Sequence, residues 1–133
     1  MDDEQKMSFR LDQMKWDKRP FLIFAADQDT STYEQQIASL NGLKLGLSAR
    51  DMAIISVFGN DRATVDGKEI NQESIQRLRS EFQVPTDQFT VILVGKDGTE
   101  KLRRKTPVAL REIFALIDSM PMRQREMRQD DSR

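Results

Sequence analysis

Residues 21–26 read Phe21-Leu22-Ile23-Phe24-Ala25-Ala26, an unbroken apolar run that follows Arg19-Pro20 and ends at Asp27. A strand covered on both faces has no polar side, so this run predicts the central strand of an α/β sheet. Residues 52–58 and 89–94 are similar runs, and residues 99–104 alternate between polar and apolar side chains. We expect these three segments to be further strands of the same sheet.

Three other segments repeat apolar side chains at steps of three and four, which predicts helices over 31–40, 71–82 and 106–120. Ser31 and Glu34 have capping-box spacing, and Asn71 is a suitable cap for the second helix. Pro107 suits the first position of the third helix.

Glycines and Asp-Gly pairs predict where these elements end. We expect Gly42 and Gly46 to terminate the first helix, and Pro85 to stop the second. Asp66-Gly67 and Lys96-Asp97-Gly98 predict two tight hairpin turns.

The resulting order, β-α-β-α-β-β-α, predicts a thioredoxin-like α/β domain with a mixed central sheet and helices on both faces. Residues 1–14 are polar and aperiodic, so we expect a flexible arm there, followed by one domain over 15–128. Residues 129–133 should form a frayed tail. The length of 133 residues suits a single domain.

Composition excludes several kinds of chemistry. The chain has no cysteine and no histidine, which removes thiol nucleophiles, disulfides, imidazole bases and Cys/His zinc sites. We assign no cofactor and no metal. The net charge of −1 gives no general attraction to nucleic acid, and no apolar run is long enough for a membrane span. The polar start indicates a cytoplasmic chain, or an exported one if a leader preceded residue 1.

Charge is unevenly distributed along the chain. Residues 1–95 carry 11 basic and 15 acidic side chains, whereas residues 96–133 carry 10 basic and 7 acidic. An acidic protein or a phosphorylated ligand could therefore bind a group made by Lys101, Arg103, Arg104 and Arg123. The alternative, which we favour, is that charge protects an edge strand from aggregation. Strand alternation predicts that Lys101 and Arg103 share a face.

Asp27 and Asp29 directly follow the central strand, with the spacing of the first motif of haloacid-dehalogenase-type phosphatases. In that chemistry one aspartate attacks phosphorus, the other acts as acid and base, and Mg²⁺ neutralises charge. The simpler interpretation, which we favour, is that Asp29, Thr30 or Ser31 caps the helix that follows.

Three stretches resemble a family of bacterial domains of unknown function: Trp16 to Phe24, Phe89 to Gly98, and Ile117 to Arg123. That family is similar to modules of vertebrate matrix proteins of the coiled-coil-domain and sushi-repeat-containing types, and is grouped with peroxiredoxin- and thioredoxin-like folds. The resemblance implies a fold but no activity. Thioredoxins carry a cysteine pair after the first strand and a cis-proline before the third, where this chain has Ala26 to Thr30 and Thr90.

We therefore predict a non-enzymatic binding or scaffold module on a redox-inactive thioredoxin-like frame. One alternative is an Mg²⁺-dependent phosphatase or phosphotransferase that uses Asp27 and Asp29. Another is a cysteine-free remnant of a peroxiredoxin that recognises a redox partner. Trp16 is a candidate either for anchoring the N-terminal segment or for recognition.

Overall fold

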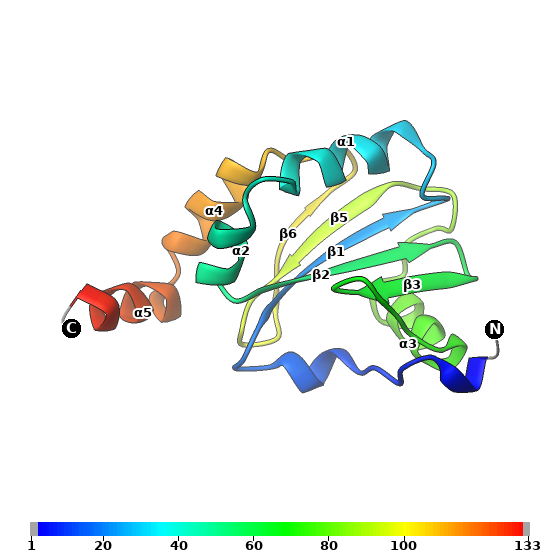
Figure 1. Ribbon diagram of the computed structural model, residues 1–133, viewed down its shortest axis with the longest axis horizontal. Coiled ribbons are helices and arrows are strands. Elements are labelled where there is room, and N and C mark those ends of the chain that lie inside the picture. The colour runs from blue at the N-terminus through cyan, green and yellow to red at the C-terminus, as the bar shows by residue number, and fades with distance from the viewer. Residues whose placement is uncertain (1–2, 132–133) are drawn as a thin grey trace.

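The computed structural model describes residues 3–131 and contains one six-stranded mixed sheet (Figure 1). The spatial order of its strands is β4-β3-β2-β1-β5-β6. Their bounds are β1 Arg19–Ala25, β2 Met52–Phe58, β3 Arg62–Val65, β4 Lys68–Glu69, β5 Thr90–Val94 and β6 Glu100–Arg104. The predicted central strand is confirmed, because β1 lies between β2 and β5 and all seven of its residues are buried.

The pairing of β1 with its two neighbours shows which strand ends lie together. Strand β2 pairs with β1 in parallel, with Arg19 opposite Met52, whereas β5 pairs with β1 antiparallel, with Phe21 opposite Leu93. The beginning of β1, the beginning of β2 and the end of β5 therefore meet at one end of the sheet. Asp27, which follows β1, and Thr90, which begins β5, lie at the other end, about 20 Å away for a strand of seven residues.

Helices cover both faces of the sheet (Figure 1). Their bounds are α1 Ser31–Leu40, α2 Lys44–Ala49, α3 Gln72–Phe82, α4 Leu110–Asp118 and α5 Pro121–Asp131. One face packs Leu22, Phe24 and Ile92 against Leu78 and Phe82 of α3. The other face packs its side chains against α1 and α4, through residues such as Leu40, Ile113 and Ile117. Alternate residues of β1 thus enter two separate cores.

Several local predictions are confirmed. The Oδ1 atom of Asn71 accepts a hydrogen bond from the backbone N–H of Ser74 at 3.0 Å, which caps α3. Asp66 and Gly67 both have positive φ, 49° and 85°, as the tight turn between β3 and β4 requires. The turn between β5 and β6 uses Gly98 at φ 83°.

Two helix boundaries differ from the sequence-based expectation. Gly46 does not end a helix; it lies within α2, where an added Cβ would come within 2.6 Å of the Phe114 ring. Pro107 does not begin α4, which starts at Leu110. The residue after it, Val108, instead exchanges two backbone hydrogen bonds with the buried side-chain amide of Gln36, at 2.8 and 3.0 Å.

The capping box expected at α1 is also absent. Thr30 is the residue that precedes α1, and its side chain makes no capping hydrogen bond. Its hydroxyl donates instead to the carbonyl oxygen of Asp27, at 2.9 Å. The favoured explanation for the aspartates, helix capping by a side chain at 29–31, therefore does not describe this turn.

The segment before β1 packs on the domain, in contrast to the flexible arm expected over residues 1–14. Phe9 is 4% exposed and Leu11 is 9% exposed, and both belong to the core under α3. The backbone N–H of Phe9 donates to Ser74 Oγ at 2.8 Å, and Met7 forms a β-bridge with Ile70. Met7, Phe9 and Leu11 alternate with polar residues, a short strand-like signal that the expectation of a flexible arm does not take into account. Residues 1–2 lie outside the described part.

The C-terminal helix runs further than the sequence-based boundary. Residues 129–131 continue α5, whereas the sequence predicts a frayed tail over 129–133; residues 132–133 are not described. Only Arg123 of this helix is buried among the side chains described, so α5 lacks an apolar stripe. Its position must depend on polar contacts.

The buried position of Phe9 leads to a prediction about stability. We expect Phe9→Ala to lower the free energy of unfolding by about 3 kcal/mol, because it removes a buried aromatic ring and leaves a cavity. Urea unfolding followed by circular dichroism measures this change. Leu45→Ala is the matched control, since Leu45 is 88% exposed, and should change stability by less than about 0.5 kcal/mol. Equal stability of both variants and wild type would mean that the N-terminal segment is a flexible arm.

Candidate functional site

A partly buried group of charged side chains lies at the end of the sheet where β1 and β2 begin. Glu126 of α5 is at its centre and accepts hydrogen bonds from Arg19 at 3.1 and 3.3 Å and from Lys96 at 2.7 Å. Lys96 also contacts Asp51 at 2.7 Å. We call this group the charge cluster; its members are Arg19, Arg50, Asp51, Lys96, Asp118, Arg123 and Glu126.

Asp118 forms the second centre of the charge cluster. Its carboxylate accepts from Arg50 at 2.8 and 3.0 Å and from Arg123 at 3.1 Å. Arg123 also donates to the carbonyl oxygen of Ala49 at 2.9 Å. These contacts join α4 and α5 to the α2–β2 connection, so the last helix is attached to the sheet mainly by ion pairs.

The cluster changes the ionisation of its acids. Burial by itself would raise the pKa of Glu126, but hydrogen bonds and charge from Arg19 and Lys96 outweigh this effect, and the pKa of Glu126 is lowered. The pKa of Asp118 is likewise lowered, because Arg50 and Arg123 outweigh its burial. Both carboxylates therefore stay ionised while the helices are docked.

Trp16 lies beside the charge cluster in an unusual conformation. Its φ angle is 73°, a left-handed value that is rare for a bulky residue, and its backbone N–H donates to the carbonyl oxygen of Lys96 at 2.6 Å. The side chain is 59% exposed, so it does not anchor the segment by burial. The chain thus holds a strained aromatic residue at the surface without gaining a core contact.

Two cavities adjoin the β5–β6 turn, and Gly95 and Asp97 line both. The Trp16 cavity has a volume of about 320 Å³ and is lined by Trp16, Arg19, Gly95, Lys96, Asp97, Lys101, Met120, Pro121, Met122 and Arg125. Cationic and apolar side chains therefore surround one space. None of the groups that line it is a nucleophile of the thiol or imidazole type, since the chain has neither.

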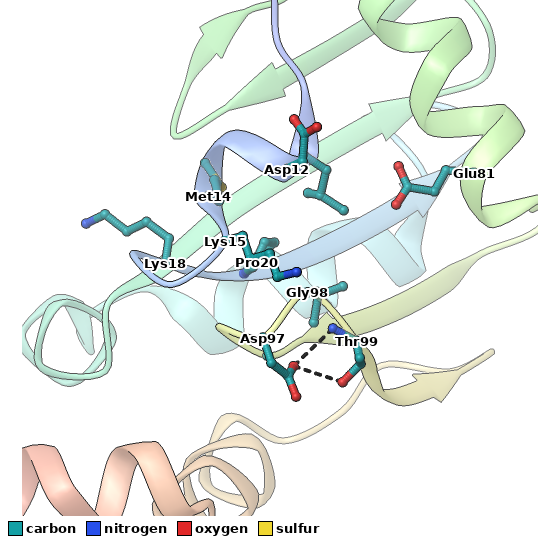
Figure 2. A pocket seen from close by; sticks show the side chains of 12 residues that line it. Asp12, Met14, Lys15, Lys18, Pro20, Glu81, Asp97, Gly98 and Thr99 are labelled. Atoms are coloured by element: carbon teal, nitrogen blue, oxygen red, sulfur yellow. Dashed lines mark hydrogen bonds between the residues drawn. The ribbon is translucent and has the colours of Figure 1, made fainter.

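The second cavity, which we call the Glu81 cavity, has a volume of about 350 Å³ and lies next to α3 (Figure 2). Asp12 and Glu81 stand on one side of it, and Asp97 and Thr99 on the other (Figure 2). Burial and the charge of Asp12 raise the pKa of Glu81. Hydrogen bonds from Thr99, with the help of Lys101, lower the pKa of Asp97 to about 2.

The basic residues predicted to bind an anion do not come together. Lys101 pairs with Asp97 at 3.0 Å and lines the Trp16 cavity. Arg103 pairs with Glu100 at 2.9 Å, and Arg104 lies 3.5 Å from Glu112. Arg123 is 8% exposed and belongs to the charge cluster. Of the four, only Lys101 lines either of the two cavities described above.

The prediction that Lys101 and Arg103 share a face is wrong. Arg103 reaches the carbonyl oxygen of Phe82 at the end of α3, whereas Lys101 lines a cavity together with Met120, which packs with the core on the other face. The reason is an irregular register between β5 and β6: Leu93 pairs with Leu102 and Val94 pairs with Glu100. The extra residue in β6 breaks the alternation that strand periodicity assumes.

Asp27 and Asp29 do not form a catalytic pair in the structure. Both are exposed, and Asp27 accepts a hydrogen bond from the backbone of the adjacent Gln28 at 2.6 Å. Within residues 3–131, no three acidic side chains are grouped so that they could hold a metal ion. The phosphotransferase alternative is therefore not supported.

The sequence alone pointed to part of the site. The sequence marks Trp16 as a candidate for recognition and Lys101 for anion binding, but no local pattern distinguishes Arg19, Lys96 or Glu126 from surface charges. One signal was present: the three stretches that carry the family resemblance contain Trp16 and Arg19, Lys96, and Asp118 with Arg123, respectively. These stretches converge on the charge cluster.

Comparison with solved structures confirms a thioredoxin-like fold of the peroxiredoxin type. Plasmodium yoelii thioredoxin peroxidase I matches 86% of this chain and 79% of its own, with a TM-score of 0.61 and 16% identity. Reduced Plasmodium vivax 2-Cys peroxiredoxin matches 86% of this chain and 84% of its own, with a TM-score of 0.62 and 14% identity. Identities this low establish the fold alone.

The family follows from the sequence comparison. The model of the domain of unknown function DUF4174 matches residues 10–126, and the chain belongs to that family. Coiled-coil domain-containing protein 80 of Danio rerio is 29% identical, over 88% of this chain and 15% of its own length. Human sushi repeat-containing protein SRPX2 is 28% identical, over 90% of this chain and 26% of its own. The chain therefore spans about a quarter or less of these relatives.

These comparisons name no activity for the domain. The peroxiredoxin-like fold is present, but this chain lacks the cysteine on which thiol chemistry depends. The alternative of a peroxiredoxin remnant that recognises a redox partner has no support beyond the shared fold. Among residues 3–131, no helix has the length and apolar character needed to cross a membrane.

The charge cluster leads to a prediction about acid stability. A carboxylate whose pKa is lowered in the folded state contributes stability above its unfolded pKa of about 4, and this contribution is lost as pH falls through the folded value. We expect Glu126→Gln to cost about 3 kcal/mol at pH 7, because Arg19 and Lys96 lose their charged partner. The variant should also lose less stability than wild type on acidification below about pH 5.

Urea midpoints measured from pH 7 to pH 3 test this prediction. The control is Glu34→Gln, which neutralises an exposed carboxylate on α1 that makes no ion pair within the described residues. It should leave both the stability and its pH dependence close to wild type. An acid transition of Glu126→Gln that matches wild type would show that Glu126 does not hold α5.

Proposed function

We propose that this domain is a non-catalytic binding module whose partner contacts Trp16 and the Trp16 cavity. The observation that carries the proposal is Trp16 itself, which has a φ of 73° and is 59% exposed. A left-handed conformation costs a bulky residue about 1–3 kcal/mol, and such strain concentrates at functional sites. The backbone N–H bond to Lys96 holds this conformation, but the exposed ring gains no burial, and a contact with another molecule would give the ring a role.

The surroundings of Trp16 support recognition rather than catalysis. Met120 and Met122 line the same cavity, and methionine side chains adapt to different binding surfaces. Tryptophan offers a large and rigid contact area at low entropic cost, and is enriched where interfaces concentrate their binding energy. The cationic members of the cavity favour an acidic partner protein.

Redox inactivity is the first expectation. Because the chain has no thiol, the purified protein should neither reduce an insulin disulfide nor consume hydrogen peroxide above the buffer rate. Dithiothreitol-coupled assays measure both reactions. A rate that stays proportional to this protein through successive purification steps would contradict a non-catalytic module.

Replacement of Trp16 separates a binding role from a structural one. We expect Trp16→Gly to change the free energy of unfolding by less than about 1 kcal/mol, because glycine tolerates positive φ and no buried ring is lost. The same variant should lose the proteins that wild type captures from an extract of the source organism. A structural anchor would instead lose about 3 kcal/mol on this replacement.

The matched control for capture is Leu45→Ala, which removes another exposed apolar side chain, 88% exposed on α2. It should retain the partners that Trp16→Gly loses. If both variants lose the same proteins, capture reflects general stickiness. If neither loses any, Trp16 is not the contact residue and the proposed function is wrong.

A further inference from the structure

We infer that the Trp16 cavity is a receptor for an oxyanion carried by a peptide, with an apolar residue of the same peptide packed on Trp16. This inference rests on the proposed function and specifies its ligand. It depends on three features of the cavity: an unpartnered buried N–H group, an excess of positive charge and an apolar wall.

The unpartnered group is Nε of Arg19. Arg19 is 1% exposed and lines the cavity, and its two terminal nitrogens are satisfied by Glu126 and by the carbonyl oxygen of Arg50. Its Nε has no hydrogen-bond partner, and is the one such buried side-chain atom among the residues described. A buried donor without a partner costs about 1–3 kcal/mol. Arg19 lines the cavity while its Nε is closed to solvent, so an acceptor in the cavity would recover this energy only on a shift of the Arg19 side chain toward it.

The positive charge around the cavity indicates that this acceptor is an anion. The charge cluster has four cations and three carboxylates, and the cavity adds the Lys101–Asp97 pair and Arg125. Arg125 is exposed and makes no ion pair within residues 3–131. Of these residues the lining itself holds four cations, Arg19, Lys96, Lys101 and Arg125, and one carboxylate, Asp97. With Asp51 and Glu126, which pair with Lys96 and Arg19, the excess beside the cavity is one positive charge. Guanidinium groups bind carboxylate and phosphoryl oxygens with charge-assisted hydrogen bonds.

The third feature, the apolar wall, favours a peptide over a free ion. Met120, Pro121, Met122 and Trp16 form the apolar part of the lining. A small inorganic anion would leave this wall in water, whereas an acidic peptide with a neighbouring apolar side chain would cover it. The cavity volume of about 320 Å³ lies at the lower end of ligand sites and suits one or two side chains.

Trp16 is the single tryptophan of the chain, so its fluorescence reports on this cavity directly. The experiment titrates the full chain with three capped peptides that differ at one position within a leucine-rich context. That position carries glutamate, phosphoserine or, as the neutral match, glutamine. We expect one or both anionic peptides to bind at least about tenfold more tightly than the glutamine peptide. The order of the affinities for the glutamate and phosphoserine peptides tells whether the oxyanion is a carboxylate or a phosphoryl group.

Variants then locate the binding site. Arg125→Gln should weaken binding of the anionic peptide about fivefold to tenfold. Added salt should reduce the remaining difference in affinity between the anionic and the glutamine peptides. The control is Arg111→Gln, since Arg111 is an exposed cation on α4 that lines neither cavity. It should bind as wild type does. Both exchanges remove one exposed positive charge, so a difference between them is local.

The outcomes distinguish this inference from the proposed function. Equal binding of anionic and neutral peptides, equal effects of the two arginine variants, or no binding of any peptide overturns the oxyanion receptor. The proposed function survives each of these results if Trp16→Gly still loses a partner that Leu45→Ala retains. If Trp16→Gly loses no partner while the anionic peptides bind, the cavity is an oxyanion site of a protein whose partner contacts lie elsewhere.

Discussion

The arrangement of the sheet end where β1 and β2 begin depends on the ion pairs of Glu126. Its carboxylate is shared by Arg19 at the beginning of β1 and Lys96 after the end of β5. Two adjacent strands and the last helix are therefore held by one negatively charged group. Helix α5 has no apolar stripe to replace this contact, because Arg123 is its one buried side chain among those described. An unpaired charge at the buried positions of Arg19, Lys96 or Arg123 would be costly, so these cations require the carboxylates of the cluster.

The Trp16 cavity exists because of that attachment. Its lining combines Trp16 from the segment before β1, Lys101 from β6 and Met122 and Arg125 from α5. These residues are far apart in the chain. Ion pairs of Glu126 with Arg19 and Lys96 hold α5 against the sheet, and this position of α5 completes the cavity. A partner that binds at this cavity, as we propose, would therefore be sensitive to the electrostatics of the cluster beneath it.

The candidate site lies at the end of the sheet away from the loop that follows β1. That loop, with Asp27 and Asp29, is where a thioredoxin-like protein would carry its cysteines, and here it is an exposed turn that makes hydrogen bonds within itself. The same frame can therefore present a binding surface at the opposite end, since a fold does not determine where its site lies. The convergence of the three family-like stretches on the charge cluster agrees with this location.

The sequence by itself determined the fold class, because each buried strand is an apolar run and α3 has a strong period. It also determined the hairpin turns, since Asp66-Gly67 supports the positive φ values that such turns need. It excluded thiol and imidazole chemistry through composition. These are local or additive properties, and each can be evaluated from neighbouring residues.

Only the tertiary structure decided the site. Lys101 and Arg103 point to different faces because of an irregularity in strand pairing, which depends on β5 as well as β6. Phe9 enters the core because α3 leaves space for it, and Gly46 is small because Phe114 packs on it. Arg19, Lys96 and Glu126 resemble ordinary surface charges in the sequence. Their burial follows from the meeting of segments up to 107 residues apart, and no local pattern encodes a contact between such distant residues.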